Sequence, residues 1–176
     1  APPLPSPPEL PLRPPVLCPG CAHRGAFYVL KRLGAYVCGD IGCYSLASLP
    51  PLASMHTCLA MGAGISQAHG ISRALGNQSA TIAVIGDSTF THTGLPALLN
   101  AVYNQSRIVV VILDNRSTAM TGGQDHPGTG RTLMGDRVPA MDFVTVARAV
   151  GVEFVERVKA GDTDALEGAL RTGLDR

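Results

Sequence analysis

Two apolar stretches that each end in polar residues decide the fold: Ala80-Thr81-Ile82-Ala83-Val84-Ile85-Gly86-Asp87-Ser88 and Ile108-Val109-Val110-Val111-Ile112-Leu113-Asp114-Asn115. Both are rich in β-branched residues and uncharged until their last positions, which is typical of strands covered on both faces. The polar strings therefore follow the carboxyl ends of two buried strands. In a parallel sheet these ends share one edge, where α/β folds bind ligands. A carboxylate and a carboxamide placed together there suit Mg²⁺ or Ca²⁺, and Mg²⁺ usually shares its shell with phosphate oxygens.

The rest of the chain alternates between helix and strand. We expect helices near 23–33, 61–75, 94–105 and 142–150 and from about 163, strands at 35–39, 80–86, 108–114 and 152–158, and a long loop from 115 to about 140. Asp142 and Asp162 are the expected N-caps of the last two helices. This alternation predicts an α/β fold, a three-layer parallel sheet with helices on both faces. A loop as long as 115–140 is usually functional in a compact domain.

The composition indicates one domain with few charges. The chain has 176 residues, of which 45% are hydrophobic and 15% charged, as expected for one globular core. So low a charge content suggests that another domain or subunit covers much of the surface, and we expect an oligomer. A net charge of +1 without a basic stretch argues against nucleic acid as a partner. Without a membrane-length apolar run or a signal-peptide pattern, we expect no membrane attachment and a cytoplasmic location.

The two ends of the chain suggest that it is a fragment of a longer polypeptide. Residues 1–15 contain eight of the fourteen prolines, which predicts an extended Pro-rich linker before a single domain at 16–176. The chain has no initiator Met, and it stops at Arg176 in or just after a predicted helix.

The two polar strings, with a helix and a strand between them, resemble the thiamine diphosphate signature of the transketolase, acetolactate synthase and 2-oxoacid:ferredoxin oxidoreductase superfamily. The resemblance implies the thiamine diphosphate-binding fold, with Mg²⁺ held by Asp87, Asn115 and the main-chain carbonyl of Ser117. Ser88 stands where many members have Gly, and it is small enough to let the backbone approach a phosphate. On the residues alone, Gly86-Asp87-Ser88 could also be an ordinary strand-to-helix turn with an N-cap.

A second group of motifs narrows the resemblance. Cys18-Pro19-Gly20-Cys21-Ala22-His23-Arg24 and Gly39-Asp40-Ile41-Gly42-Cys43 resemble the 2-oxoacid:ferredoxin oxidoreductases, and most of all the large (alpha) subunits of the indolepyruvate:ferredoxin oxidoreductases. Further matching strings are Thr57-Cys58-Leu59, Met61-Gly62-Ala63, Ala68-His69-Gly70, Met120-Thr121-Gly122-Gly123-Gln124 and His126-Pro127-Gly128. Together the matches span about residues 13–150.

The resemblance implies an enzyme for the oxidative decarboxylation of a 2-oxoacid, an aryl pyruvate such as indolepyruvate, to the acyl-CoA with electrons passed to ferredoxin. The implied partners are a pyrimidine-binding domain that supplies an activating Glu, a ferredoxin-like cluster domain or subunit, ferredoxin and coenzyme A. Glu153 and Glu156, in a late segment, do not fit the role of the activating Glu. We therefore expect the isolated chain to be inactive.

The resemblance also assigns residues to the rest of the cofactor site. We expect the diphosphate and thiazolium to be lined by Asp40, Gly42, Cys43, Gly86, Ser88, Ala119, Met120 and Thr121. Met61 is the candidate apolar wedge under the cofactor, with the Leu59 carbonyl as acceptor for its amine, although Met61 could equally be a core residue. The many small residues of 61–76 predict a helix packed closely against a backbone or a cofactor, because Gly otherwise costs helix stability.

The cysteines leave several interpretations open. Cys-x-x-Cys in a reducing compartment indicates a metal site, an iron–sulfur cluster or a redox pair. A 4Fe–4S cluster takes four thiolates. Cys18, Cys21 and Cys43 are the candidates, with a fourth ligand outside this chain; Cys38 or Cys58 could substitute, or no cluster forms. Cys38, inside a strand, is expected to be a small buried apolar residue.

The histidines near the predicted edge are candidates for chemistry. His92, just after the Asp87 turn, and His23 are the candidate catalytic residues, because a histidine there could orient substrate or transfer a proton. His126 lies in another matching motif near the same rim. Each could instead satisfy local hydrogen bonds, and we expect His56 and His69 to be structural.

Three other functions share part of this pattern. A non-oxidative thiamine-dependent lyase or decarboxylase of the acetolactate synthase type shares the metal motif but does not need Cys18, Cys21 and Cys43. A redox or metal-binding module without thiamine needs the cysteines but not Asp87 and Asn115. A non-catalytic partner-binding domain keeps the fold and binds no thiamine diphosphate. Metal-dependent cofactor binding and ferredoxin reduction separate these alternatives.

Overall fold

The structure, a computed structural model, describes residues 9–76 and 80–176. Residues 9–15 of the expected linker are exposed and carry neither helix nor strand, while residues 1–8 of it lie outside the described residues. In the described part of the chain, no helix is long and apolar enough to cross a membrane.

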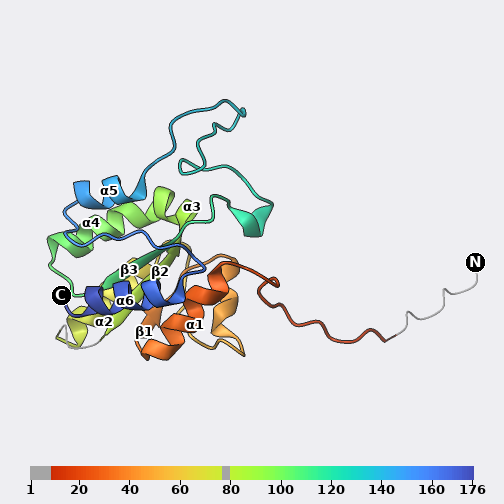
Figure 1. The fold of residues 1–176 in the computed structure, drawn as a ribbon, viewed down its shortest axis with the longest axis horizontal. Coiled ribbons are helices and arrows are strands. Elements are labelled where there is room, and N and C mark those ends of the chain that lie inside the picture. Colours follow the sequence, from red (N-terminus) through yellow and green to blue (C-terminus); the bar gives the residue numbers. More distant parts are fainter. Residues whose placement is uncertain (1–8, 77–79) are drawn as a thin grey trace, which may run out of the picture.

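Three parallel strands form the sheet at the centre of the molecule (Figure 1). They are β1 (Tyr36–Cys38), β2 (Thr81–Gly86) and β3 (Val109–Leu113), in the order β1-β2-β3. The register places Cys38 beside Ala83 and Ala83 beside Val110. All residues of β2 are buried, as expected for a central strand covered on both faces.

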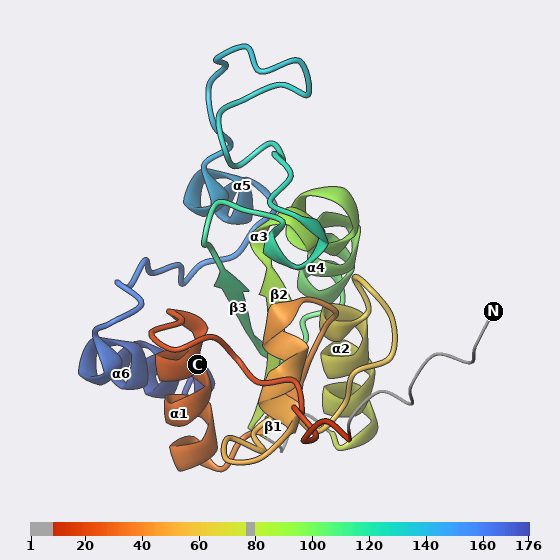
Figure 2. The same ribbon diagram turned by 90° about the vertical axis from the view of Figure 1, so that its right-hand side faces the viewer.

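Helices cover both faces of the sheet, so the predicted three-layer α/β fold is confirmed. Figure 2 shows α1 (His23–Leu33) and α6 (Thr163–Leu174) on one side, and α2 (Gly64–Ala74) and α4 (Leu95–Tyr103) on the other. Alternate residues of β2 point to opposite faces. Ile82 and Val84 join the core with α1 and α6. Ala83 and Ile85 join the core with α2, α4 and α5 (Phe143–Ala149).

Short helical segments connect these elements. They are the 3₁₀ helices η1 (Cys43–Ser48) and η3 (Ala119–Thr121), the short helix α3 (Asp87–Thr89) and the π-helical η2 (Phe90–Gly94), which leads from α3 into α4. Asp142 and Asp162 cap α5 and α6 as predicted, accepting the backbone N–H of Thr145 and Ala165.

Helix α2 begins three residues later than the predicted start, at Gly64 instead of residue 61. The backbone at Gly62 has a φ of +88°, which lies outside the helical region. At Gly64 an added Cβ would lie 3.0 Å from the carbonyl oxygen of Gly39 and 3.2 Å from that of Val84. The predicted close approach of this helix to a backbone is therefore confirmed, and that backbone is β2 and the residue that follows β1.

The predicted strand at 152–158 is wrong. In the described structure this segment pairs with no strand, and β3 is the last strand of the sheet. Val152 and Val155 pack against the apolar core beside α5, while Phe154 lies near Gly173 of α6. The apolar side chains of the segment are thus partly removed from water by packing against other side chains. The sequence pattern is the same as that of a strand, but the backbone makes no strand hydrogen bonds within the described chain.

The long segment after β3 leaves the body of the domain. Both views show the middle of residues 120–141 projecting beyond α5 and the sheet, while His126 is buried at the base (Figures 1 and 2). We call residues 125–141 the excursion. An isolated bridge joins Arg131 to Arg137 near its tip, where Leu133 is 98% and Met134 86% exposed.

Candidate active site

Asp87 joins the ends of β2 and β3. Its carboxylate is buried, and Oδ1 accepts the backbone N–H of Ser88 at 2.7 Å. Oδ2 accepts two backbone N–H groups from beyond β3, that of Asn115 at 3.1 Å and that of Arg116 at 2.7 Å. The structure therefore brings the two polar strings together at the carboxyl edge of the sheet, as their strand positions predict.

Asn115 and Ser117 form a tight turn against this carboxylate. Asn115 Oδ1 accepts the backbone N–H of Ser117 at 3.2 Å, and Arg116 between them has a left-handed φ of +54°. Asn115 Nδ2 lies 3.4 Å from His23 Nε2, to which it can donate. The amide nitrogen of Asn115 therefore faces His23, and its amide oxygen faces the turn that ends at Ser117.

Ser88 connects the turn after β2 with the start of the long segment. Its hydroxyl oxygen accepts the hydroxyl of Thr118 at 2.9 Å. Thr118 directly precedes η3, whose residues Ala119, Met120 and Thr121 are all exposed. Thr118 thus links Ser88 to the start of η3, although nothing in the sequence pointed to Thr118.

Tyr44 holds the end of β2 in place. Its hydroxyl accepts the backbone N–H of Gly86 at 2.9 Å and donates to the carbonyl of Ile41 at 3.1 Å. A Cβ at Gly42 would lie 2.4 Å from the Tyr44 ring, and one at Gly86 would lie 3.0 Å from it. Both glycines thus leave room for this ring. Burial, more than the nearby charge of Asp40, raises the pKa of Tyr44 well above its usual value.

Asp40 supports a second turn at the same edge. Its fully buried carboxylate accepts three backbone N–H groups, those of Ile41 (2.7 Å), Gly62 (2.7 Å) and Gly64 (3.1 Å). These bonds fix the turn that carries Leu59 and Met61, whose side chains are 75% and 46% exposed. Because its oxygens are already bonded to the backbone, the contribution of Asp40 to this edge is to hold the turn in place.

The cysteines are all free, and only Cys38 is fully buried. Its burial in the core confirms the predicted small apolar role. Cys18 is exposed, whereas Cys21 and Cys43 are half-buried. Cys58 donates its thiol to the Asp40 carbonyl at 3.5 Å, and burial raises its pKa. Within residues 9–76 and 80–176, no three His, Cys, Asp or Glu side chains are grouped so that they could hold a metal ion.

Two buried histidines contact the Asp87–Asn115 pair, His23 at Asn115 and His126 at Asp87. His23, the first residue of α1, also meets the Tyr44 ring edge-on, and burial lowers its pKa despite the nearby charge of Asp87. His126 Nε2 lies 3.3 Å from Asp87 Oδ2. His92, in contrast, is exposed on η2.

The remaining histidines have structural partners, as predicted. His56 Nδ1 accepts the backbone N–H of Val37 at 3.0 Å, and His69 bonds to the Ser106 hydroxyl.

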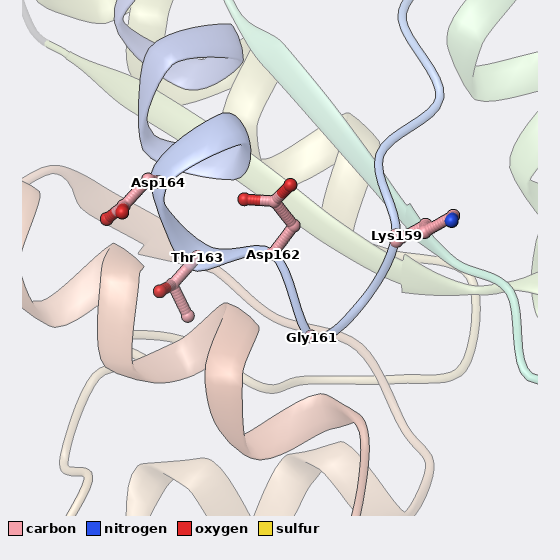
Figure 3. Close-up of a pocket in the computed structure, with 5 residues that line it drawn as sticks. All are labelled: Lys159, Gly161, Asp162, Thr163 and Asp164. Atoms are coloured by element: carbon pink, nitrogen blue, oxygen red, sulfur yellow. The ribbon is translucent and has the colours of Figure 1, made fainter.

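The hollows in the described surface include one at the start of α6 and one that His126 lines beside Asp87. Figure 3 shows one at the start of α6, lined by Lys159, Gly161, Asp162, Thr163 and Asp164. The side chains of Lys159 and Asp164 point in opposite directions there, so they do not converge on a ligand. The other hollow, of about 730 Å³, lies between the excursion and α5, and His126 is part of its lining.

The sequence of this chain matches a known family of protein domains. Residues 40–176 match the thiamine pyrophosphate enzyme C-terminal TPP-binding domain, over most of the chain. The chain belongs to this TPP-binding family. Its members bind thiamine pyrophosphate, the same molecule as thiamine diphosphate, so the predicted cofactor is confirmed.

Sequence relatives of this TPP-binding domain carry one name. The indolepyruvate oxidoreductase subunit IorA of Methanothermobacter marburgensis is 48% identical over 176 residues, and that of Thermococcus kodakarensis 45% over 183 residues. These matches cover 95% and 94% of this chain but 28% of each relative. The chain therefore spans less than a third of the length of the curated relatives that it matches.

Solved structures confirm the TPP-binding fold. A 2-oxoglutarate:ferredoxin oxidoreductase from Magnetococcus marinus, with 2-oxoglutarate, coenzyme A and succinyl-CoA bound, aligns with a TM-score of 0.77 at 20% identity. The alignment covers 93% of this chain and 61% of that one. A benzoylformate decarboxylase from Polynucleobacter necessarius aligns with a TM-score of 0.58 at 17% identity, over 95% and 32% of the two chains.

Proposed function

We propose that this TPP-binding domain holds Mg²⁺–thiamine diphosphate through Asp87, Asn115 and the main-chain carbonyl of Ser117. The proposal rests mainly on the hydrogen bonds that Asp87 Oδ2 accepts from the N–H groups of Asn115 and Arg116. These bonds bring the three proposed metal ligands together at one edge of the sheet. All three metal ligands would be oxygen atoms, as a hard cation such as Mg²⁺ requires.

The residues around this edge have separate roles in the proposal. Ser88, Gly86 and the exposed η3 residues Ala119, Met120 and Thr121 form the rim along which the diphosphate would lie. Asp40 fixes the turn that presents the Leu59 carbonyl and the Met61 side chain to the ring system. Gly42 and Cys43 lie at the start of η1, where Tyr44 ties this region to β2.

We propose that the whole protein oxidatively decarboxylates a 2-oxoacid, passes the acyl group to coenzyme A and passes the electrons to ferredoxin. The support is the 45–48% identity to proteins named indolepyruvate oxidoreductase subunit IorA, which favours an aryl pyruvate such as indolepyruvate. Bound thiamine diphosphate would supply the carbon nucleophile and the electron sink for this reaction. This domain binds and orients that cofactor, and His23 and His92 remain the candidates for orienting substrate or moving a proton.

The proposal requires protein beyond this chain. A pyrimidine-binding domain would supply the activating Glu, because Glu153 and Glu156 both lie between α5 and α6 and are exposed. We assign electron transfer to a ferredoxin-like cluster domain or subunit. Cys18, Cys21 and Cys43 are not grouped as a metal site here, so no step is assigned to them. The five free cysteines favour a reducing, cytoplasmic compartment.

The proposed reaction is tested with the full-length protein and its cluster-bearing partner. We expect reduction of ferredoxin that depends on indolepyruvate, coenzyme A and thiamine diphosphate together, with pyruvate and 2-oxoglutarate as poorer substrates. Decarboxylation without ferredoxin reduction or acyl-CoA formation would instead indicate a non-oxidative lyase. A protein that binds the cofactor but turns over no 2-oxoacid would contradict the proposed activity.

A further inference from the structure

His126 is a buried histidine with one of its ring nitrogens accounted for. Its side chain is 4% exposed, and Nδ1 accepts the backbone N–H of Gly128 at 3.2 Å. A neutral imidazole carries a single N–H, so an accepting Nδ1 places the proton on Nε2. His126 therefore presents an N–H donor, not an acceptor, at its far end.

The donor end of His126 faces the carboxylate of Asp87. Among the described residues, Nε2 is buried without a hydrogen-bond partner of good alignment, and it lies 3.3 Å from Asp87 Oδ2. A buried donor without an acceptor is costly, by about 1–3 kcal/mol. A small rotation of either side chain would align the two, which makes the carboxylate the natural acceptor.

The contacts of Asp87 are unevenly divided between its two oxygens. Oδ2 accepts the N–H groups of Asn115 and Arg116 and faces His126 Nε2, whereas Oδ1 accepts the N–H of Ser88. The donors thus gather on Oδ2 and leave a lone pair of Oδ1 for a cation.

Neighbouring residues hold His126 in this position. A Cβ at Gly128 would lie 2.9 Å from His126 Cε1 and 2.8 Å from Phe143 Cζ, so a larger residue would displace the ring. The carbonyl of His126 accepts the N–H and the hydroxyl of Thr129 at 2.8 and 2.9 Å. The Pro127 carbonyl accepts the N–H of Met141 at 2.9 Å, which closes the base of the excursion.

We propose that His126 is a positioning residue: its Nε2–H holds Asp87 Oδ2, fixes the rotation of the carboxylate and directs Oδ1 toward the cation. The inference rests on the proposed function, because it assumes that Asp87 is a ligand of Mg²⁺. It also makes the base of the excursion part of the metal site. Partners that orient metal ligands in this way typically change metal affinity 10–100-fold when they are lost.

Two substitutions separate this role from a purely structural one. In His126→Asn the side-chain amide ends near the position of Nδ1, so it can keep the bond to Gly128 but cannot reach Asp87. In His126→Gln the amide nitrogen reaches the position of Nε2 and can donate to Asp87. The control is His69→Asn, which removes a histidine of α2 whose ring bonds to Ser106 and not to Asp87.

The experiment is a calorimetric titration of Mg²⁺ into the full-length protein in a fixed excess of thiamine diphosphate, corrected by the same titration without protein. We expect His126→Asn to raise the Kd for Mg²⁺ by about 10–100-fold. His126→Gln and His69→Asn should both stay within about threefold of wild type, which is small against the losses expected for an orienting partner.

The outcomes distinguish this inference from the proposed function. Equal Mg²⁺ affinities for His126→Asn and His126→Gln, whether both normal or both weakened, would overturn the positioning role while wild type still binds the cofactor. A wild-type protein that binds no thiamine diphosphate with Mg²⁺ would overturn the proposed function, and this inference with it.

Discussion

Tyr44 shows how one side chain can fix the backbone beside the cofactor edge. Its hydroxyl both accepts from the Gly86 N–H and donates to the Ile41 carbonyl. Tyr44→Phe leaves both backbone groups without this partner, so we expect the free energy of unfolding to fall by about 1–3 kcal/mol. Urea unfolding measures the change.

Tyr103→Phe is the matched control for that substitution. Tyr103 is 84% exposed, so loss of its hydroxyl should change the free energy of unfolding by less than about 0.5 kcal/mol. Equal effects of the two substitutions would show that the hydrogen bonds of Tyr44 do not stabilise the end of β2.

His23 predicts a pH dependence of stability. Burial lowers the pKa of His23 in the folded state below its usual value of 6.5, so the unfolded state binds a proton that the folded state refuses. The contribution of His23 is therefore complete above about pH 6.5 and is lost as the pH falls below it, by at most about 1.4 kcal/mol per pH unit.

The measurement compares urea unfolding at pH 7.5 and 5.5 for wild type and His23→Gln, which cannot take up the proton. We expect wild type to lose more stability than the variant on acidification. Equal losses would mean that His23 is not held neutral by burial.

The sequence identified the residues at the strand ends but not those that support them. Asp87, Asn115 and Ser117 could be placed together because apolar strands precede them and parallel strands share one carboxyl edge. Tyr44 gave no such signal, since its partner Gly86 lies far along the chain. Nor did the hydroxyl pair of Thr118 and Ser88, which forms only when the long segment folds back.

At the scale of elements, α2 contains two glycines in opposite environments. A Cβ at Gly64 would meet backbone oxygens of Gly39 and Val84 that cannot move aside, whereas at Gly70 it would meet nothing within 4 Å. We expect Gly64→Ala to destabilise the fold by about 1–3 kcal/mol. Gly70→Ala should stabilise it by about 0.5–1 kcal/mol, because Gly is a poor helix former.

Thermal or urea unfolding of both variants tests this difference within a single helix. Gly64→Ala should also weaken thiamine diphosphate binding, because the N–H of residue 64 is one of the three held by Asp40. Two variants of equal stability would contradict the close approach of α2 to the sheet.

Most helices and strands were predictable because their signals are local. The apolar periodicity of α1, the caps Asp142 and Asp162 and the charge-free runs of β2 and β3 each lie within one segment. The strand predicted at 152–158 was wrong because a pattern of apolar residues indicates contact with the core and not backbone pairing. Its apolar residues are half-buried by side-chain packing alone, while Glu153, Glu156 and Arg157 are exposed.

At the scale of the molecule, the described structure has a packed body and an open edge. The three-layer core places Asp87, Asn115, His23 and Tyr44 at one end of the sheet. Exposed apolar side chains follow there, Leu59 and Met61 on a turn and Met120 in η3. The excursion extends further, with Leu133 and Met134 almost fully exposed (Figure 1). We expect another domain or subunit to cover part of this surface, as the low charge content of the chain predicts.

In the proposed site, Asp87 and Asn115 hold thiamine diphosphate through a divalent cation. The decisive measurement is a calorimetric titration of the full-length protein with thiamine diphosphate, with and without Mg²⁺. The control is Asp114→Ala, which removes the neighbouring exposed carboxylate. We expect wild type and Asp114→Ala to bind only with Mg²⁺ and Asp87→Ala to lose binding. Wild-type binding without Mg²⁺, or normal binding by Asp87→Ala, would contradict the claim.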